Sequence, residues 1–88
     1  MSYQVEISQG ASKQLNKLPP KLQECIHAKI DDLATDPRAN GVKKLKNRDN
    51  GYRIRVGDYR IIYDILDEIL LIIIIEVGHR SSIYKDKK

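Results

Sequence analysis

The sequence predicts an α+β fold: an N-terminal strand, a two-helix hairpin, an antiparallel sheet of three to four strands, and a short C-terminal turn or helix. Three patterns support this order. Apolar residues recur at helical spacing on either side of Pro19 and Pro20, apolar and polar residues alternate from Gly51 to Asp64, and residues 69–75 are all apolar. We expect residues 1–88 to form a single domain, because one small core is all that such a length supports.

The N-terminal elements follow from apolar spacing and from the two prolines. Residues 3–8 alternate apolar and polar side chains, which is typical of a short strand, and residues 11–18 carry apolar side chains at helical spacing. Proline ends the first helix and suits the first turn of the second. The apolar stripe of the second helix consists of Leu22, Cys25, Ile26, Ile30, Leu33 and Ala34. We therefore expect Cys25, the single cysteine, to be a small buried residue rather than a nucleophile.

The segment "GYRIRVGDYRIIYD" predicts a hairpin whose two-residue turn is Gly57-Asp58. Val56 then faces Tyr59, Arg55 faces Arg60, and directly opposed residues share one face of the sheet. One face collects Tyr52, Ile54, Val56, Tyr59, Ile61 and Tyr63, and the other collects Arg53, Arg55 and Arg60 with Asp64. The apolar face should pack against the helices, which leaves the three arginines on an open face.

The remaining strands are predicted from shorter signals. Residues 42–46 allow a short strand within a polar, turn-rich segment. After a turn near Asp67-Glu68, the segment "ILLIIIIEV" predicts a central strand that is covered on both faces.

Positive charge is concentrated in the middle of the chain. Residues 38–60 hold eight Lys or Arg against two Asp, a net +6, whereas the segments before and after them each sum to −1. A localised basic patch indicates a polyanion partner, although a solvated lysine cluster has the same composition. We expect Lys43, Lys44, Lys46 and Arg48 to contact such a polyanion.

The C-terminal motif "VGHRSSIY" contains further candidate catalytic residues. Arg80 and Tyr84 are four residues apart, so one helical turn would place them on the same side. His79 is the side chain there that titrates near neutral pH. A frayed terminus with solvated Arg and Tyr is the alternative interpretation.

Together, the segments "KQLNKLP", "DPRANGVKKLK", "YRIRVGDYRIIYDI" and "EVGHRSSIY" resemble the RelE/ParE superfamily of toxins from type II toxin-antitoxin modules, and the RelE branch in particular. The resemblance implies a RelE-like, microbial-RNase-like fold that enters the ribosome and cuts mRNA, and that a cognate antitoxin holds inactive. Operator DNA would be contacted only through the antitoxin complex. The resemblance implies catalytic roles for Arg53, Arg55, Arg60, Arg80 and Tyr84, and we add His79 as a candidate from its own chemistry. It also implies that the polyanion expected at Lys43, Lys44, Lys46 and Arg48 is RNA.

Cleavage of RNA by its own 2′-OH needs a base, an acid and cations for the charged phosphorane, but no metal or cofactor. Arginines supply the cations and are poor bases, so His79 and Tyr84 remain the candidates for proton transfer. The alternative is a ParE-like, non-enzymatic inhibitor of DNA gyrase, because a positive face also suits a binding protein. With one cysteine and no apolar run long enough to span a bilayer, we expect a cytoplasmic protein without a membrane partner.

Overall fold

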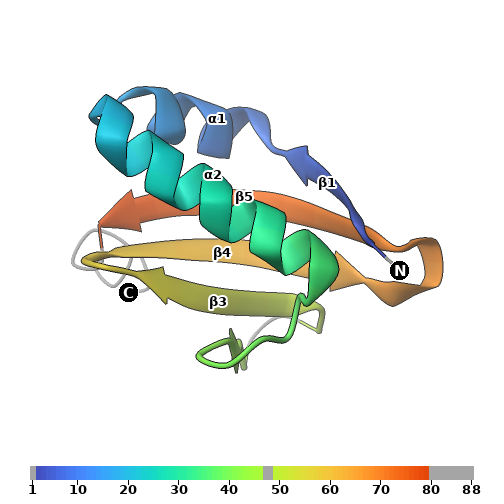
Figure 1. Cartoon of the computed structure of the whole chain (residues 1–88). Helices are drawn as coiled ribbons and strands as arrows, with labels where there is room; N and C mark the ends of the chain where they lie inside the picture. Colours follow the sequence, from blue (N-terminus) through green and yellow to red (C-terminus); the bar gives the residue numbers. More distant parts are fainter. Residues whose placement is uncertain (1, 47–48, 80–88) are drawn as a thin grey trace.

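The computed structural model describes residues 2–46 and 49–79, and both helices lie on one side of a curved sheet (Figure 1). The elements in chain order are β1 (Gln4–Ile7), α1 (Gln9–Asn16), α2 (Pro20–Thr35), β2 (Lys43–Lys44), β3 (Gly51–Val56), β4 (Tyr59–Leu66), the 3-10 turn η1 (Asp67–Ile69) and β5 (Leu71–His79). The predicted order of an N-terminal strand, a two-helix hairpin and a run of strands is confirmed.

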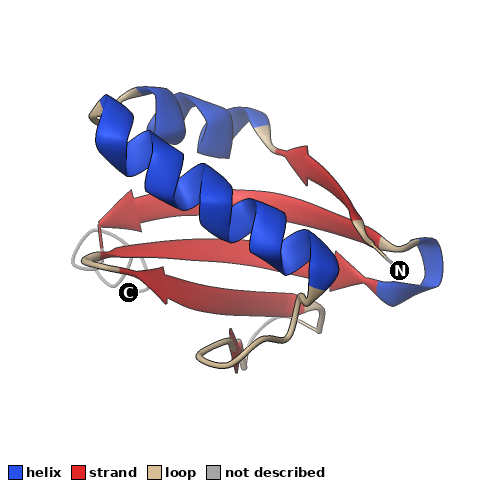
Figure 2. Cartoon of the chain, in the orientation of Figure 1, coloured by secondary structure: helices blue, strands red, loops and turns tan. Residues whose placement is uncertain are grey.

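The sheet has the strand order β1-β5-β4-β3-β2, which places β4 at its centre. The contacts β5–β4, β4–β3 and β3–β2 are antiparallel, as expected, but β1 pairs with β5 in parallel, so Val5 lies opposite Ile72. The four strands that follow the helices agree with the predicted three to four, and the N-terminal strand extends the sheet to five described strands. The two helices carry the chain from β1, at one edge of the sheet, to β2, at the other edge (Figure 2).

Local signals set the helix ends. The Ser8 side chain accepts a hydrogen bond from the Ala11 N–H at 3.1 Å and caps α1, and Pro20 occupies the first turn of α2, where its missing N–H costs nothing. On α2 the fully buried residues are Ile26, Ile30 and Leu33, spaced by four and three. Cys25 is exposed, so the expectation of a buried cysteine is wrong. Cys25 immediately precedes the buried Ile26, and one residue corresponds to a rotation of about 100° around the helix axis. This rotation takes Cys25 off the buried face.

The hairpin has the predicted register. Tyr52 lies opposite Tyr63, Ile54 opposite Ile61, and Arg55 opposite Arg60. Gly57 takes a φ of 60° in the turn, a conformation that glycine adopts without strain. Tyr63 is completely buried, and its hydroxyl donates to the Pro37 carbonyl oxygen at 2.8 Å. Burial raises the pKa of Tyr63 and keeps this donor protonated.

A β-bulge shifts the face presented by β5 partway along the strand. Ile62 lies opposite Glu76 whereas Tyr63 lies opposite Ile74, so Ile75 is the extra residue on β5. Before the bulge Ile72 and Ile74 enter the main core, and after it Val77 does so, although it is three residues from Ile74. Without the bulge, strict alternation would turn Val77 away from the helices.

The helices cover only one face of β5 (Figure 2). Leu71 and Ile73 are partly exposed on the other face, so the expectation of a strand covered on both faces is wrong. Beyond them Ile75 packs against a small second cluster of Leu45 and Ile62. Within the described residues, no helix is long and apolar enough to cross a bilayer.

A polar network joins three distant segments at the end of the sheet where the N-terminus lies (Figure 1). Arg38 donates to both carboxylate oxygens of Asp67, at 3.2 and 2.8 Å, and the Tyr3 hydroxyl donates to Asp67 Oδ1 at 2.6 Å. The Arg38 guanidinium also lies 5.2 Å from the centre of the Tyr52 ring. Hydrogen bonds from Arg38 and then Tyr3 lower the pKa of Asp67 to about 2.

This lowered pKa predicts an acid-sensitive contribution to stability. The carboxylate stabilises the fold fully above its ordinary pKa of 3.8, and this contribution disappears as the pH falls through about 2. Asp67→Asn should therefore lower the free energy of unfolding at pH 7, and the difference from wild type should shrink between pH 4 and pH 2. Urea denaturation across this range measures it. Asp31→Asn, on the exposed side of α2, makes the same charge change and should show a constant difference; a difference for Asp67→Asn that is equally constant would contradict the assignment.

Candidate nucleic-acid interface

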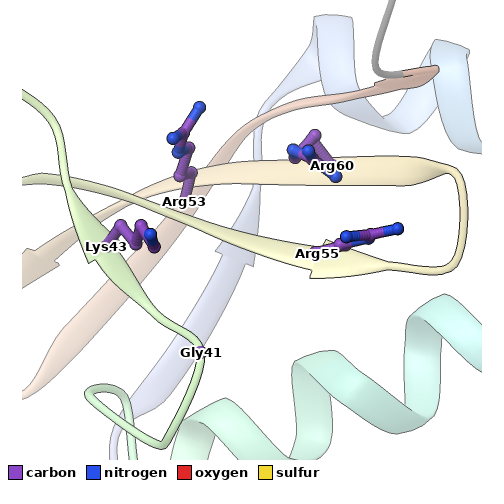
Figure 3. Close-up of a pocket in the computed structure, with 5 residues that line it drawn as sticks. All are labelled: Gly41, Lys43, Arg53, Arg55 and Arg60. Carbon is purple, nitrogen blue, oxygen red and sulfur yellow. The ribbon is translucent and has the colours of Figure 1, made fainter.

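Four cationic side chains gather on the face of the sheet that the helices leave open. Arg53 and Arg55 are two apart on β3 and therefore share a face, Arg60 lies opposite Arg55 on β4, and Lys43 lies opposite Arg53 on β2. With Gly41 they line a cavity of about 260 Å³ (Figure 3). The predicted grouping of the three arginines is confirmed, and Lys43 joins them.

The strand register places like charges side by side. Arg55 and Arg60 are directly opposed, an arrangement that destabilises an antiparallel pair. Arg55 is exposed and its Nε donates to the Gly57 carbonyl oxygen at 3.1 Å, which directs the side chain toward the hairpin turn. Arg60 is half-buried, with its Nη1 shielded from solvent. The charges are thus held by the backbone at fixed spacing on a stiff support.

Such an arrangement is suited to binding phosphate. A guanidinium stays charged at every physiological pH and can donate two parallel hydrogen bonds to phosphate oxygens. Adjacent strands are about 4.8 Å apart, so the four cations cover a patch small enough to meet one or two phosphates of a single strand. The four cations can neutralise negative charge that develops on the phosphoryl oxygens. None of these four side chains readily accepts a proton.

The other predicted RNA-binding residues lie elsewhere or outside the described residues. Lys44 lies opposite Tyr52, on the helix side of the sheet, with its Nζ 5.1 Å from the centre of the Tyr52 ring and donating to the Asp49 carbonyl oxygen. Lys46 is exposed just beyond β2. Arg48 lies outside the described residues. Lys43 is therefore the one of the four that the structure brings to the arginines.

His79 is the one C-terminal candidate that the structure describes, and it is separated from the arginines in a similar way. The register pairs His79 with Tyr59, and the two rings meet edge to face with their centres 5.4 Å apart. Tyr59 belongs to the face that collects Ile54, Ile61 and Tyr63, so His79 lies at the margin of the helix side. Arg80 and Tyr84 lie outside the described residues. The catalytic roles of His79, Arg80 and Tyr84 stay predictions.

Two residues of the basic segment 38–60 were not singled out from the sequence as candidates for a site or for a structural role. Gly41 lines the cavity and has a φ of 92°, a left-handed conformation that favours glycine. The Asn40-Gly41 pair is a turn signal, and it could have indicated a tight turn beside the strand at residues 42–46. Arg38 belongs to the same basic segment but binds Asp67, so its charge serves the fold.

The chain is similar to a family described as the ParE toxin of type II toxin-antitoxin systems, which matches residues 5–84. It is 34% identical to a putative toxin RelE1 of Methanocaldococcus jannaschii over 98% of this chain and 99% of that protein, and 28% identical to the mRNA interferase toxin RelE of Escherichia coli over 98% and 94%. A solved toxin–antitoxin complex, RelBE2 of Mycobacterium tuberculosis, contains a chain with a TM-score of 0.80 and 31% identity, covering 91% of this chain and 100% of that one.

The cation patch predicts a defined salt dependence of RNA binding. Each phosphate that is neutralised on a single strand contributes about −0.7 to the slope of log K against log salt concentration. Arg55→Gln should therefore make the slope less steep by about 0.7, and should change the free energy of unfolding by less than about 0.5 kcal/mol because a repulsion is relieved. Fluorescence anisotropy with a short single-stranded RNA and urea denaturation measure the two effects.

The matched control is Lys21→Gln, which removes one positive charge from an exposed position on α2. It should leave the slope unchanged. An equal effect of the two substitutions would show that only net charge matters, and would contradict a binding site on the open face.

Proposed function

Because the chain belongs to the ParE toxin family of type II toxin-antitoxin systems, we propose that it is an endoribonuclease that cuts mRNA on the ribosome and thereby stops translation. Two findings support the RelE type of activity. A relative that aligns with 98% of the chain is named an mRNA interferase, and the fold is shared with RelE toxins over most of both chains. The observation that carries the proposal is the cluster of Lys43, Arg53, Arg55 and Arg60 on one rigid face.

The cleavage proceeds by attack of the 2′-OH on the adjacent phosphorus. The bond between O2′ and phosphorus forms, the bond from phosphorus to O5′ breaks, and the products are a 2′,3′-cyclic phosphate and a 5′-hydroxyl. Negative charge grows on the phosphoryl oxygens in the transition state, and preorganised cations stabilise it more than they stabilise the ground state. Arg60 serves the scissile phosphate, while Arg53, Arg55 and Lys43 hold the neighbouring phosphates.

The roles of the C-terminal residues form part of the same proposal. Arg80 adds a cation at the phosphorane, and Tyr84 supplies a phenol that stacks on a base or hydrogen-bonds in the transition state. His79, the last residue of β5, would transfer a proton. Lys44, Lys46 and Arg48 would contact RNA or ribosome beyond the cavity.

The partners follow from the relatives. The solved relative from Mycobacterium tuberculosis is a toxin–antitoxin complex, and we extend this assembly to a cognate antitoxin for this chain. The antitoxin would bring acids to the open face and would mediate any contact with operator DNA. The site of action is the cytoplasm, where ribosomes translate.

A gyrase inhibitor is the second candidate, because the matching family is named for ParE. The two functions differ in which cellular process stops first, protein synthesis or the control of DNA supercoiling. Induction of the chain without an antitoxin should stop protein synthesis within minutes and leave DNA supercoiling unchanged. DNA breaks that depend on gyrase, with translation still running, would instead support the ParE type of action.

In vitro, Arg60→Gln should slow single-turnover cleavage of ribosome-bound mRNA by about 10²-fold or more, because one donor to the developing charge is lost. The wild-type products should carry a 2′,3′-cyclic phosphate and a 5′-hydroxyl, which end-specific ligation distinguishes from a 5′-phosphate. Lys21→Gln is the matched control and should cleave at the wild-type rate. Products that carry a 5′-phosphate would mean that water was the nucleophile and would contradict the mechanism.

A further inference from the structure

The described residues that line the cavity include no ready base, and the β-bulge on β5 brings a carboxylate to its edge. A 2′-OH must lose its proton as it attacks phosphorus, and the cavity is lined by one lysine, three arginines and a glycine. Arginine does not deprotonate in proteins, so the lining contributes cations and no ready proton acceptor. The structure must supply the acceptor from a neighbouring position.

Glu76 occupies such a position. The register pairs it with Ile62 on β4, Ile62 pairs in turn with Arg53 on β3, and Arg53 pairs with Lys43 on β2. Directly opposed residues share a face, so Glu76 stands in one row across the sheet with Arg53 and Lys43.

The packing agrees with this placement. Ile62 and its partner Leu45 form a small cluster that is separate from the core under the helices, and Ile75 packs against it. Val77, the next residue after Glu76, is 2% exposed within the main core. Ile75 and Glu76 therefore both face the open side, as a bulge produces, and Glu76 is a partly buried residue there.

Glu76 is also a diagonal neighbour of Arg60. Arg60 lies opposite Gly78, two residues beyond Glu76 on the same strand, and diagonal neighbours have their Cβ atoms within about 7–8 Å. Gly78 has no side chain, so the β5 residue paired with Arg60 places no side chain beside it. A phosphate bound by Arg60 at the margin of the cavity would thus place its ribose between the guanidinium and the carboxylate.

We propose that Glu76 is the general base that takes the proton from the attacking 2′-OH, an assignment that rests on the mRNA cleavage proposed above. The carboxylate accepts the 2′-OH proton while O2′ bonds to phosphorus, and the bond from phosphorus to O5′ breaks. The departing O5′ takes a proton from a general acid or from water, and Glu76 returns its proton to solvent.

The test is single-turnover cleavage of ribosome-bound mRNA by wild type and by Glu76→Gln, which keeps the shape and removes the charge. The proposal expects cleavage to slow by about 10²-fold or more, with unchanged or tighter RNA binding and an unchanged thermal unfolding midpoint. Glu76→Asp keeps the carboxylate and should recover most of the rate. Glu6→Gln makes the same charge change on the same face, on edge strand β1 opposite Ile73, and should cleave like wild type.

Three results would overturn the proposal. Cleavage by Glu76→Gln within about threefold of wild type would show that the carboxylate is not the base. Faster cleavage would show that it merely repels RNA. A wild-type protein that cuts no mRNA on the ribosome would overturn the proposed function and this assignment together, and the wild-type reaction separates that failure from the other two.

Discussion

The pairing of β4 with both of its neighbours determines the rest of this structure. β4 is the central strand, and every side chain on it must either enter the core beneath the helices or face the open side. Its register with β3 is set by a tight turn at Gly57, and its register with β5 changes at one bulge. A slip of one residue between β3 and β4 would move arginines into the core and Ile54 or Ile61 out of it, and a slip between β4 and β5 would turn Val77 out of the core.

The same alternation therefore creates both the core and the candidate site. Ile61 and Tyr63 are buried because they point toward the helices, and Arg60 is on the open face because it lies between Tyr59 and Ile61. The opposed Arg55 and Arg60 destabilise the hairpin slightly, and the apolar face of the same two strands compensates. The two like charges that destabilise the fold are therefore placed where they can bind phosphate.

The hairpin was predictable from the sequence because its turn and its alternation are local. The register of residues 51–64 and the grouping of Arg53, Arg55 and Arg60 follow from counting outward from Gly57-Asp58. The parallel pairing of β1 with β5 joins residues almost 70 positions apart, and no local signal specifies such a partner.

The bulge could not be predicted, because residues 71–75 are all apolar and carry no alternation that would reveal a change of face. Its effect reaches the candidate site. After the bulge Glu76 faces the open side and His79 lies beside Tyr59 on the other side, the reverse of what continuous alternation from Ile72 and Ile74 would give. A predicted proton-transfer residue therefore lies away from the arginines, and a glutamate that the sequence did not single out lies near them.

The central claim is that RNA phosphate binds the open face of β2, β3 and β4. The most direct measurement is NMR titration of the purified chain with a short single-stranded RNA, in which the 2′-OH next to the scissile phosphate is replaced by hydrogen to prevent cleavage. The account predicts that the side-chain Nε–H signals of Arg53, Arg55 and Arg60 shift together, while Tyr52 and the exposed residues of α2 stay unchanged. Shifts confined to the helix side, with the three arginine signals unmoved, would contradict it.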